Sequence, residues 1–538
     1  MTGTSYSAQA KKRAPLHIKP EAVASLNPSA CLALPQSPAS RASLEEALRW
    51  IFPSPVYQAI EDECKTFQMR DHRISFNQAE LQMLFDARKL SQPETPPVAW
   101  CNAFAVYEEK EEGLRRRPIF EPLVNDIIAR SVNPLLSVRT TYTPREDIRR
   151  AVFLSECGAQ FDYSAWFDQI PLHPELRKFF GVSTASGTFV LPLLAMGFKP
   201  SCQVAQALTN SIRDVSIANV FSGSCVDNVL FTGSRADVTA ASTSFIQRSE
   251  SVGARLKSKT IELRTAYDFL GEHYDHVAKT RCLSQKTADK AHYALNFLRQ
   301  RKPSTTKQLR AIYGLLLYAA GTLRIVVARF HWAMRFMSWF ASTPEDRLHV
   351  IPSDVRTELV CWAQVASENT PVAVWEEEVE VDLTIYTDAS ATGWGAISVS
   401  KGGSVLCLSQ PWTAHDHAAW NLSSSVAAEP LAIRKAVAAL VPRTARRVLL
   451  YTDHESFCFA SEKSWGKAYA YSCALQFLAS YGTKFDIRHI AGELNPADVL
   501  SRARHMPGSF TGPPLLPVTA VGDSVFNSRE EGERGQMG

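Results

Sequence analysis

The stretch Ser224–Gly233 constrains this chain most, because it sets a polar pair between two short apolar runs. The pair is Asp227-Asn228, and the run that follows it is Val229–Phe231. Asp and Asn both tolerate positive φ, so the pattern predicts a tight two-residue hairpin with a carboxylate at its tip. Most pairs of this kind are only turns. The alternative, a functional site, gains weight because a second carboxylate, Asp162, ends a short apolar segment upstream.

The composition is that of an ordinary globular protein, with 45% hydrophobic and 21% charged residues among 538. No run approaches the roughly twenty apolar residues of a membrane span, and the N-terminus lacks the apolar core of a signal peptide. The eleven cysteines stand singly, which argues against a structural zinc or a disulfide framework. We therefore expect an intracellular protein, cytoplasmic or nuclear, with no membrane partner. The net charge of +4 permits nucleic-acid binding without requiring it.

Local patterns divide the chain into segments of different character. Residues 1–40 are rich in Ala, Ser and Pro and lack a period, which predicts a mobile leader. A helical lead-in follows, with apolar faces at Leu44, Ala47, Leu48 and Ile51 and at Leu81, Leu84 and Phe85. Residues 281–375 are predicted to be largely helical. The Gly- and Pro-rich residues beyond Arg504 predict disorder.

Three segments could surround the predicted hairpin. Glu108–Asn125 is charged and can be either an exposed hairpin or a basic ribbon that closes over a polyphosphate, for which arginine is well suited. Asp162 is followed by the bulky Trp166-Phe167 pair, which can form a wall beside a metal-phosphate site. In the third segment, Lys199 and Ser201 can meet backbone phosphates, and Ser201 is a good N-cap for a helix.

A second set of carboxylates lies downstream. Asp388 and Asp453 each end a predicted strand, and Glu429 opens a predicted helix in which Pro430 is tolerated because it lies in the first turn. Asp498 lies on a short helix after Asn495-Pro496. Each acid alone is more often a cap or a surface charge. Together, however, these carboxylates repel one another unless cations lie among them, which predicts Mg²⁺ or Mn²⁺.

The first group of segments resembles the palm of a reverse transcriptase. In chain order the chain reads Arg-Arg-Pro-Ile, Asp-x(4)-Phe-x-Gln-Ile-Pro-Leu, Met-Gly-Phe-Lys-Pro-Ser and Val-Asp-Asn. Leu256–Lys259 and Phe269–Gly271 resemble the last two palm motifs, and Ser304–Gly314 resembles the thumb segment of long-terminal-repeat retroelements. The resemblance implies two Mg²⁺ or Mn²⁺ ions, about 3.5–4 Å apart, bridged by Asp162 and Asp227.

The resemblance also implies roles for other residues. Arg116 and Arg117 would hold the triphosphate of a dNTP, Lys259 would protonate the departing pyrophosphate, and Phe167 would exclude a ribose 2′-hydroxyl. Gly197 and Lys199 belong to the third motif. Two positions depart from the family pattern: Asn228 replaces a second Asp and loses its charge, and Met196 replaces a Gln that would bond the nucleotide.

The second group resembles a retroelement ribonuclease H. It reads Thr-Asp-x-Ser-x(2)-Gly-x-Gly, an isolated Glu, Tyr-Thr-Asp and His-x-x-Gly-x-x-Asn-x-x-Asp-x-x-Ser-Arg. The resemblance implies metal-assisted hydrolysis of RNA in an RNA–DNA hybrid by two ions held by Asp388, Glu429, Asp453 and Asp498. His489 matches a loop histidine that assists product release or proton transfer, although a histidine at a strand end can equally be structural.

We therefore expect an α+β and α/β multidomain protein. A right-hand polymerase (fingers, palm and thumb, with an antiparallel palm sheet and helices) would be followed by an RNase H-like α/β domain. The expected segments are 1–97 (leader and helical extension), 98–280 (fingers and palm), 281–330 (thumb), 331–380 (connection), 381–505 (RNase H-like) and 506–538 (tail).

The resemblance implies an RNA-directed DNA polymerase with RNase H activity. Its partners would be an RNA template, a DNA primer, an RNA–DNA hybrid and dNTPs, with other retroelement proteins possible and the oligomeric state open. The wording is closest to tyrosine-recombinase (DIRS-like) and then long-terminal-repeat elements. Asn228 and Met196 keep open the alternative of a decayed or domesticated copy that binds hybrids, with RNase H activity only or no catalysis.

Overall fold

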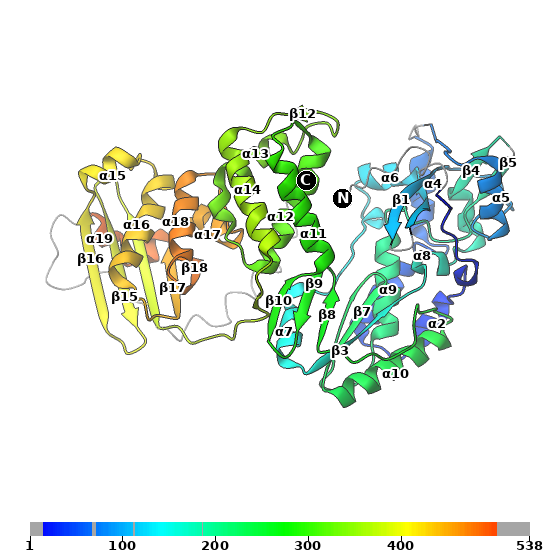
Figure 1. Ribbon diagram of the computed structural model, residues 1–538, viewed down its shortest axis with the longest axis horizontal. Helices are drawn as coiled ribbons and strands as arrows, with labels where there is room; N and C mark the ends of the chain where they lie inside the picture. The colour runs from blue at the N-terminus through cyan, green and yellow to red at the C-terminus, as the bar shows by residue number, and fades with distance from the viewer. Residues whose placement is uncertain (1–13, 67–70, 111–112, 186, 503–538) are drawn as a thin grey trace. The chain divides into compact units, whose positions relative to one another are not determined.

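The computed structural model describes residues 14–66, 71–110, 113–185 and 187–502 (Figure 1). The predicted tail and the first part of the predicted leader lie outside these ranges. The chain divides into two compact units, one made of residues 1–284 and 371–375 and the other of residues 285–370 and 376–538. The mixed α/β, multidomain organisation expected from the sequence is confirmed. Within the described ranges, no helix is long and apolar enough to cross a bilayer.

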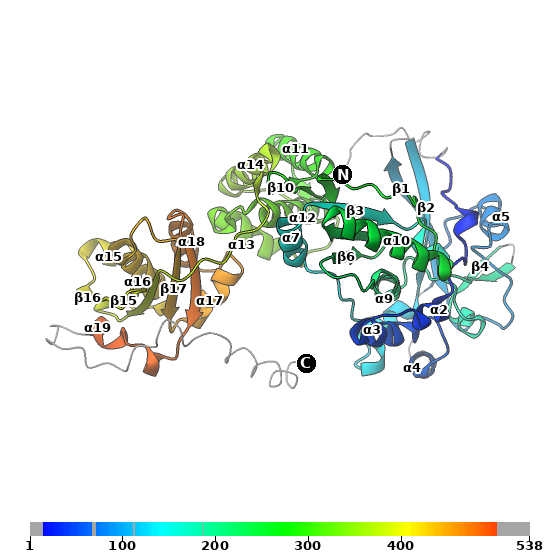
Figure 2. The ribbon, with the colours of Figure 1, turned by 90° about the horizontal axis from the view of Figure 1, so that it is seen from below.

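The centre of the first unit is a three-stranded antiparallel sheet in the order β3-β7-β6. Its strands are β3 (Cys157–Asp162), β6 (Phe221–Cys225) and β7 (Asn228–Gly233). Helices α9 (Ser201–Arg213) and α10 (Arg235–Ser251) lie along one face, where Phe245 packs against Phe161 and Phe231 (Figure 2). Side chains alternate along a strand, so Leu230 faces the other way and packs on α7 (Arg145–Leu154).

Smaller elements complete the first unit. It contains a long hairpin of β1 (Cys101–Lys110) and β2 (Gly113–Pro122), a short hairpin of β4 (Gly181–Thr184) and β5 (Gly187–Val190), and a four-stranded sheet in the order β13-β10-β9-β8. The strands of this last sheet are β8 (Ala266–Phe269), β9 (Glu272–Asp275), β10 (Thr280–Leu283) and β13 (Val372–Ala373). The remaining helical elements are η1 (Pro20–Ala22), α2 (Pro28–Ala33), α3 (Pro38–Leu48), α4 (Pro55–Cys64), α5 (Gln78–Asp86), α6 (Val124–Arg130), η2 (Pro134–Leu136), α8 (Trp166–Gln169) and η3 (Pro174–Phe179).

The prediction of a mobile leader is wrong for residues 14–40. These residues form η1, α2 and the start of α3, and Leu16, Leu26 and Cys31 are buried in the core of the unit. The prolines that suggested a loop stand at the first position of these helices, where a proline costs no hydrogen bond. Only a few separate apolar side chains anchor this segment to the core, and they show no helical or strand period in the sequence. The sequence therefore could not predict that the segment has a fixed structure.

The second unit begins with helices, as predicted. These are α11 (Gln285–Arg299), α12 (Thr306–Leu323), η4 (Val327–Phe330), α13 (His331–Phe340) and α14 (Ser353–Glu368), with a two-residue ladder between β11 (Ser304–Thr305) and β12 (Leu348–His349).

A five-stranded sheet follows, in the order β16-β15-β14-β17-β18. The strands are β14 (Leu383–Ala389), β15 (Gly393–Ser400), β16 (Val405–Pro411), β17 (Arg447–Thr452) and β18 (Lys484–His489). The ladders β14–β17 and β17–β18 are parallel, and the others are antiparallel.

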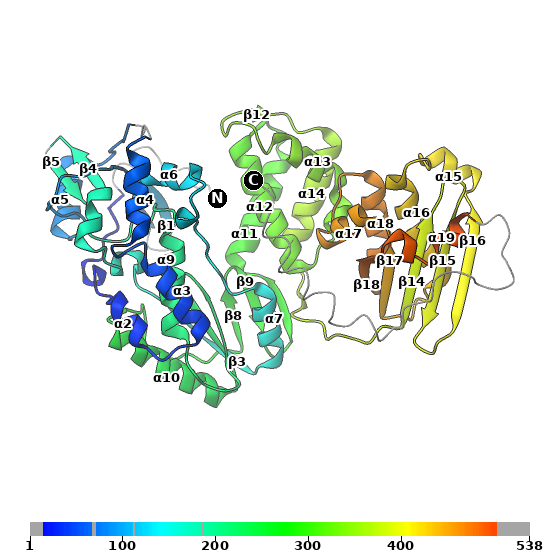
Figure 3. The ribbon, with the colours of Figure 1, turned by 180° about the vertical axis from the view of Figure 1, so that it is seen from behind.

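Helices cover both faces of this sheet. α16 (Ser425–Leu440) and α18 (Tyr469–Ala479) cover one face, and α19 (Asp498–Arg502) covers the other (Figure 1 and Figure 3). The shorter helices α15 (Ala414–Ala419), α17 (Glu455–Glu462) and η5 (Gly492–Leu494) complete the unit. Because β14 and β17 are parallel, their carboxyl ends lie at the same edge of this sheet. The predicted carboxylates Asp388 and Asp453 lie at that edge.

Candidate active sites

Three carboxylates, two of them buried and one partly buried, converge in the second unit. Asp388 lies near the end of β14 and Asp453 directly follows β17, so the parallel pairing of these strands places both at one edge of the sheet. Glu429 reaches them from α16. Oxygen atoms of Asp388, Glu429 and Asp453 all lie within 4.8 Å of one another. We call this group the carboxylate triad.

Glu429 does not open its helix, contrary to the sequence prediction. α16 begins at Ser425 after the N-cap residue Ser424, so Glu429 and Pro430 lie inside the helix. Residues Ser425–Ala428 add a turn ahead of Glu429, so Pro430 does not lie in the first turn as expected. Glu429 consequently lies deeper than a first-turn acid would, with its side chain against β14.

The triad is strongly desolvated. Asp388 is only 2% exposed and Glu429 only 5% exposed. Burial, followed by the charges of Asp388 and Asp453, raises the pKa of Glu429 to about 9. Burial likewise raises the pKa of Asp388 to about 6, against a hydrogen bond from Ser501 that lowers it, and burial raises the pKa of Asp453.

The triad is suited to a hard divalent cation. Glu429 Oε1 accepts a hydrogen bond from the Ala389 amide at 3.1 Å, but Glu429 Oε2 and Asp388 Oδ2 are buried without a hydrogen-bond partner among the described residues. A buried carboxylate oxygen that lacks a donor is costly unless a cation binds it. Carboxylate oxygens are the ligands preferred by Mg²⁺ and Mn²⁺.

Asp498 and His489 lie beside the triad rather than in it. Asp498 Oδ1 accepts from Arg502 Nη2 at 2.6 Å, and the Asp498 charge helps to raise the pKa of Asp388. His489 ends β18 in register with Thr452, is exposed, and through its charge opposes the rise in the Asp453 pKa. Asn495, which the sequence analysis places only ahead of the helix of Asp498, is buried and donates to the Thr387 carbonyl at 2.9 Å, next to Asp388.

In the first unit, the sheet brings together Asp162, the last residue of β3, and Asp227, the turn residue directly before the neighbouring strand β7. Asp162 is paired directly with Asn228, and the Asp227 carbonyl accepts from the Tyr163 amide at 3.0 Å. Asn228 Nδ2 donates to Asp227 Oδ1 at 2.9 Å. The side-chain amide of Asn228, the position where the sequence pattern discussed above has a second Asp, therefore orients the Asp227 carboxylate.

The hairpin turn lies one residue earlier than predicted. Cys225 pairs with Asn228, so the two loop residues are Val226 and Asp227, and Val226 rather than Asn228 has positive φ (54°). A β-branched residue is strained there, at a cost of about 1–3 kcal/mol.

Helix α9 holds the strained residue on both sides. Gln206 Oε1 accepts from the Val226 amide at 2.7 Å, and Thr209 Oγ1 donates to the Val226 carbonyl at 2.5 Å. Sequence reasoning missed this contact because nothing in the pattern of α9 shows which of its polar residues face the hairpin.

Lys257 is a site residue that sequence reasoning missed. Its ammonium forms an ion pair with Asp162 Oδ2, and both residues line a cavity of about 220 Å³ with Asn228 and Ser258. Lys259, the predicted proton donor, instead pairs with Glu250 at an exposed position. Lys257 and Lys259 belong to the same sequence motif, so the sequence cannot show which of them is the proton donor. Only the course of the chain after α10 places Lys257, rather than Lys259, beside Asp162.

The electrostatics of this first site also permit a cation. Asp162 Oδ1 is buried and lacks a partner among the described residues. Burial, followed by the charge of Asp162, raises the pKa of Asp227, while Lys257 and Arg117 oppose that rise. Two acids of like charge side by side are stabilised by a bound cation, which fits a metal site with fewer ligands than the triad.

The arginines of β2 separate by face. Arg117 Nη2 contacts Glu108 Oε1 at 3.0 Å, and its Nη1 lies 4.0 Å from Met196 Sδ. Arg116 points to the opposite face, where it pairs with Glu80 and donates to the Ala14 carbonyl at 2.9 Å. The structure thus brings Arg117 and Met196 together near Asp227 and places Arg116 elsewhere.

Other predicted residues position the surrounding segments. Phe167 is partly buried against the core, and its neighbour Asp168 forms a largely buried ion pair with Lys89 at 2.8 Å. Gly197 donates to the Phe120 carbonyl, and a Cβ there would lie 2.5 Å from the same oxygen, so only glycine permits this contact.

Ser201 is the first residue of α9 and not its N-cap, which is Pro200. Its hydroxyl donates to the Ala195 carbonyl at 2.6 Å and is buried, so it cannot meet a phosphate.

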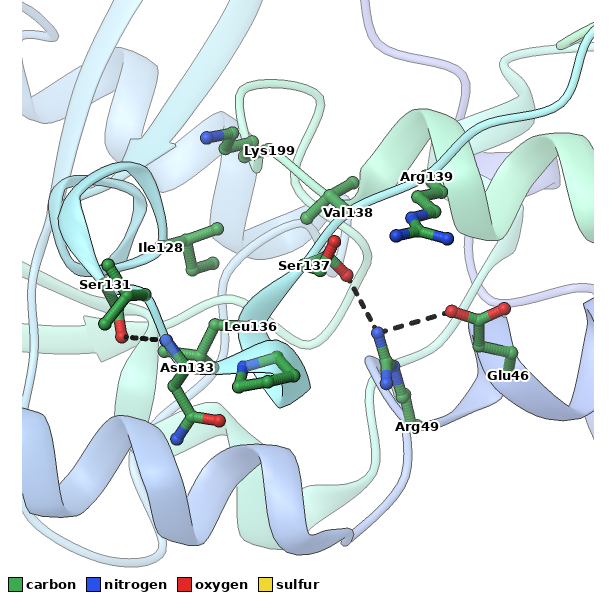
Figure 4. A pocket seen from close by; sticks show the side chains of 12 residues that line it. Glu46, Arg49, Ile128, Ser131, Asn133, Leu136, Ser137, Val138, Arg139 and Lys199 are labelled. Atoms are coloured by element: carbon green, nitrogen blue, oxygen red, sulfur yellow. Dashed lines mark hydrogen bonds and ion pairs between the residues drawn. The ribbon is translucent and has the colours of Figure 1, made fainter. Parts of the chain in front are cut away.

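Lys199 lines a separate, polar cavity of about 650 Å³ (Figure 4). Arg139 and Arg49 line the same cavity, and Arg49 is held by Glu46 at 3.5 Å and by the Ser137 carbonyl at 2.9 Å. The excess of cations over carboxylates agrees with the predicted contact between Lys199 and a phosphate, which stays a prediction.

The chain matches no protein-family model and no characterised protein sequence. Among solved structures, it is similar to the foamy viral protease-reverse transcriptase dRH in complex with double-stranded DNA. That structure is 13% identical over 86% of this chain and 81% of its own, with a TM-score of 0.44. The complex of the foamy viral protease-reverse transcriptase with an RNA/DNA hybrid is 14% identical over 84% of this chain and 58% of its own, with a TM-score of 0.42. At these values the geometry of the carboxylates is the firmer basis for a function.

Proposed function

We propose that the chain is an RNA-directed DNA polymerase with RNase H activity, acting on retroelement RNA. The observation that carries the proposal is the carboxylate triad, whose two buried oxygens without a partner among the described residues fit a pair of Mg²⁺ or Mn²⁺ ions. The pair Asp162 and Asp227 on a separate sheet supplies a second candidate site for such ions. Two acidic sites in two units fit an enzyme that both makes and degrades a hybrid.

At the triad, bound ions would activate a water and steady the leaving oxygen of an RNA phosphodiester. Asp388, Glu429 and Asp453 would hold them as ionised carboxylates, and Asp498, whose charge acts on Asp388, would join them when Arg502 releases it. His489, exposed at the same edge, would meet the product. A hybrid would be recognised by its shape, its phosphates and its 2′-hydroxyls.

At the hairpin, bound ions would activate a primer 3′-hydroxyl and hold the leaving pyrophosphate. Asp162 and Asp227 would bridge them, with Asn228 as a neutral oxygen ligand. Lys257 must then leave the Asp162 carboxylate, and its freed ammonium would face the pyrophosphate in the role first expected of Lys259. Phe167 would exclude a 2′-hydroxyl, and Arg117 would contact the triphosphate of a dNTP.

The substrates would be an RNA template, a DNA primer and dNTPs, within the cytoplasm or the nucleus. We also propose that the fingers, palm, thumb, connection and RNase H-like domain have the boundaries expected from the sequence. The chain would originate from a tyrosine-recombinase or long-terminal-repeat element.

A hydrolase without polymerase activity is the second candidate. It is favoured by the ion pair between Lys257 and Asp162 and by the uncharged Asn228, both of which weaken a metal site at the hairpin. The triad has no such defect.

Cleavage of a labelled RNA strand within an RNA–DNA hybrid tests the proposal at its strongest site. Glu429→Gln and Asp453→Asn should each reduce Mg²⁺-dependent cleavage by about a thousandfold, because an ion ligand is lost. Glu455→Gln, at an exposed position on α17, is the matched control and should cleave normally. Full cleavage by Glu429→Gln, or none by folded wild-type protein, would refute the hydrolase assignment.

A further inference from the structure

Residues 14–37 form a segment that we call the N-terminal strap, and it touches the elements that surround the hairpin site. Its first part lies beside β2, where the His17 amide donates to the Arg116 carbonyl at 2.7 Å. Its middle lies beside α8, where Ala24 and Leu26 donate backbone hydrogen bonds to Asp168 and Gln169 at 2.9 and 3.0 Å. The strap therefore joins β2 to the segment that directly follows Asp162.

Two basic side chains of the strap face this site. Arg115 Nη1 lies 3.3 Å from His17 Nδ1, and Lys19 Nζ donates to Ser164 Oγ at 3.3 Å, two residues beyond Asp162. His17 and Lys19 are two residues apart in an extended segment, so they point to the same side. Lys19 has no carboxylate partner in the part of the chain that the structure describes.

Lys19 lies among other positive charges. Among the described side chains, Arg115 and Arg117 pair with the same carboxylate, Glu108, at 2.7 and 3.0 Å. Burial, and then the charges of Arg115, Lys19 and Arg117, lower the pKa of His17, so these groups lie within electrostatic reach of one another. Positive charges beside a carboxylate pair also attract phosphate oxygens and offset the repulsion between a triphosphate and the carboxylates.

We propose that Lys19, together with Arg115 and Arg117, binds the triphosphate of the incoming nucleotide. This inference rests on the proposed polymerase function and adds a substrate contact from a segment that the sequence left without a role. Lys19 already donates beside the Asp162 loop, and a flexible ammonium whose acceptor among the described residues is a neutral hydroxyl gains from a charged phosphate acceptor. The strap is then part of the nucleotide site and not a passive extension.

Substitutions at Lys19 distinguish the effect of its positive charge from the effect of its hydrogen bond to Ser164. Lys19→Gln keeps a donor for Ser164 but removes the charge, and it should raise the KM for dTTP about tenfold on an oligo(dT)-primed RNA template while kcat changes about twofold at most. Lys19→Arg should restore KM to within about threefold of wild type. Lys65→Gln, at the exposed end of α4 where Lys65 pairs with Asp62, is the matched control and should leave KM unchanged.

Binding of dTTP to the protein with template and a dideoxy-terminated primer gives a readout that needs no turnover. The proposal predicts a dissociation constant about tenfold higher for Lys19→Gln than for wild type, at an unchanged thermal unfolding midpoint. Equal affinities would overturn it, as would equal losses in Lys19→Gln and Lys19→Arg, which would make Lys19 a tether. Wild-type protein that binds dTTP through Lys19 but never incorporates it would refute the polymerase and leave the phosphate contact standing.

Discussion

At the scale of single residues, Glu429 makes the stability of the metal-free protein depend on pH. An unfolded Glu releases its proton near pH 4.5, whereas folded Glu429 holds it to about 9. Within that window the folded state binds more protons than the unfolded state, so stability is greatest at low pH and falls as the pH rises. We expect the unfolding temperature in EDTA to fall between about pH 5.5 and pH 8.5.

Differential scanning fluorimetry checks this prediction. Glu429→Gln should flatten the profile and raise the unfolding temperature at alkaline pH, because it removes a buried group that would otherwise have to ionise. Glu455→Gln, on the surface of α17, should leave the slope as it is. Mg²⁺ should stabilise wild type more at about pH 8 than at about pH 6, since protons compete for the same oxygens. A flat wild-type profile in EDTA would contradict the burial of this acid.

The sequence predicted which types of residue form the two sites better than it predicted which side chains point into them. The acids of the triad were found because strand-end Asp and helix Glu residues recur in a recognisable order, and parallel strands then bring them to one edge. Lys257 and Arg117 could not be distinguished from Lys259 and Arg116, because alternation along β2 and the course of the loop after α10 are fixed only by long-range packing. The positive φ at Val226 was missed for the same reason, since Gln206 and Thr209 of a distant helix stabilise it.

At the scale of elements, the N-terminal strap depends on a close approach to Gly253. Gly253 has φ 77°, and a Cβ there would lie 2.2 Å from the Ser25 carbonyl oxygen. Gly253→Ala should therefore displace the strap, which limited proteolysis would detect as faster cleavage within residues 14–37. The cost should be roughly 1–3 kcal/mol from the backbone conformation, with the clash in addition.

Gly482→Ala is the matched control for that experiment. Gly482 has a similar φ of 73°, but a Cβ there would meet nothing within 4 Å, so the substitution carries backbone strain without a clash. It should leave cleavage of the strap unchanged. Equal protection of the strap in wild type and Gly253→Ala would contradict the close approach.

Helices and strands with a clear period were the elements that the sequence predicted well. The helical faces of α3 and α5, the helices of residues 285–368 and the strands before Asp388 and Asp453 all appear where they were expected. The strap and the start of α16 were predicted wrongly. The strap was expected to be mobile from its composition and lack of period, and Pro430 was expected in the first turn of its helix although α16 begins a turn earlier. Whether a helix forms at such positions depends on the burial of a few apolar side chains. The composition of the segment does not show which side chains are buried.

At the scale of the whole molecule, the two acidic sites lie in different compact units. The hairpin site is built entirely within the first unit and the triad entirely within the second. Each site should therefore be removable by substitution without loss of the chemistry of the other site.

Primer extension and hybrid cleavage, measured together on an oligo(dT)-primed RNA template with Mg²⁺ and with Mn²⁺, test this prediction most directly. Asp227→Asn should abolish dTTP incorporation and leave RNA cleavage intact, and Asp388→Asn should do the reverse. Incorporation that survives Asp227→Asn would contradict the assignment of Asp227 as an ion ligand of the polymerase site. Folded wild-type protein that cleaves hybrid RNA but incorporates nothing with either metal would contradict the polymerase and leave a hybrid-specific nuclease.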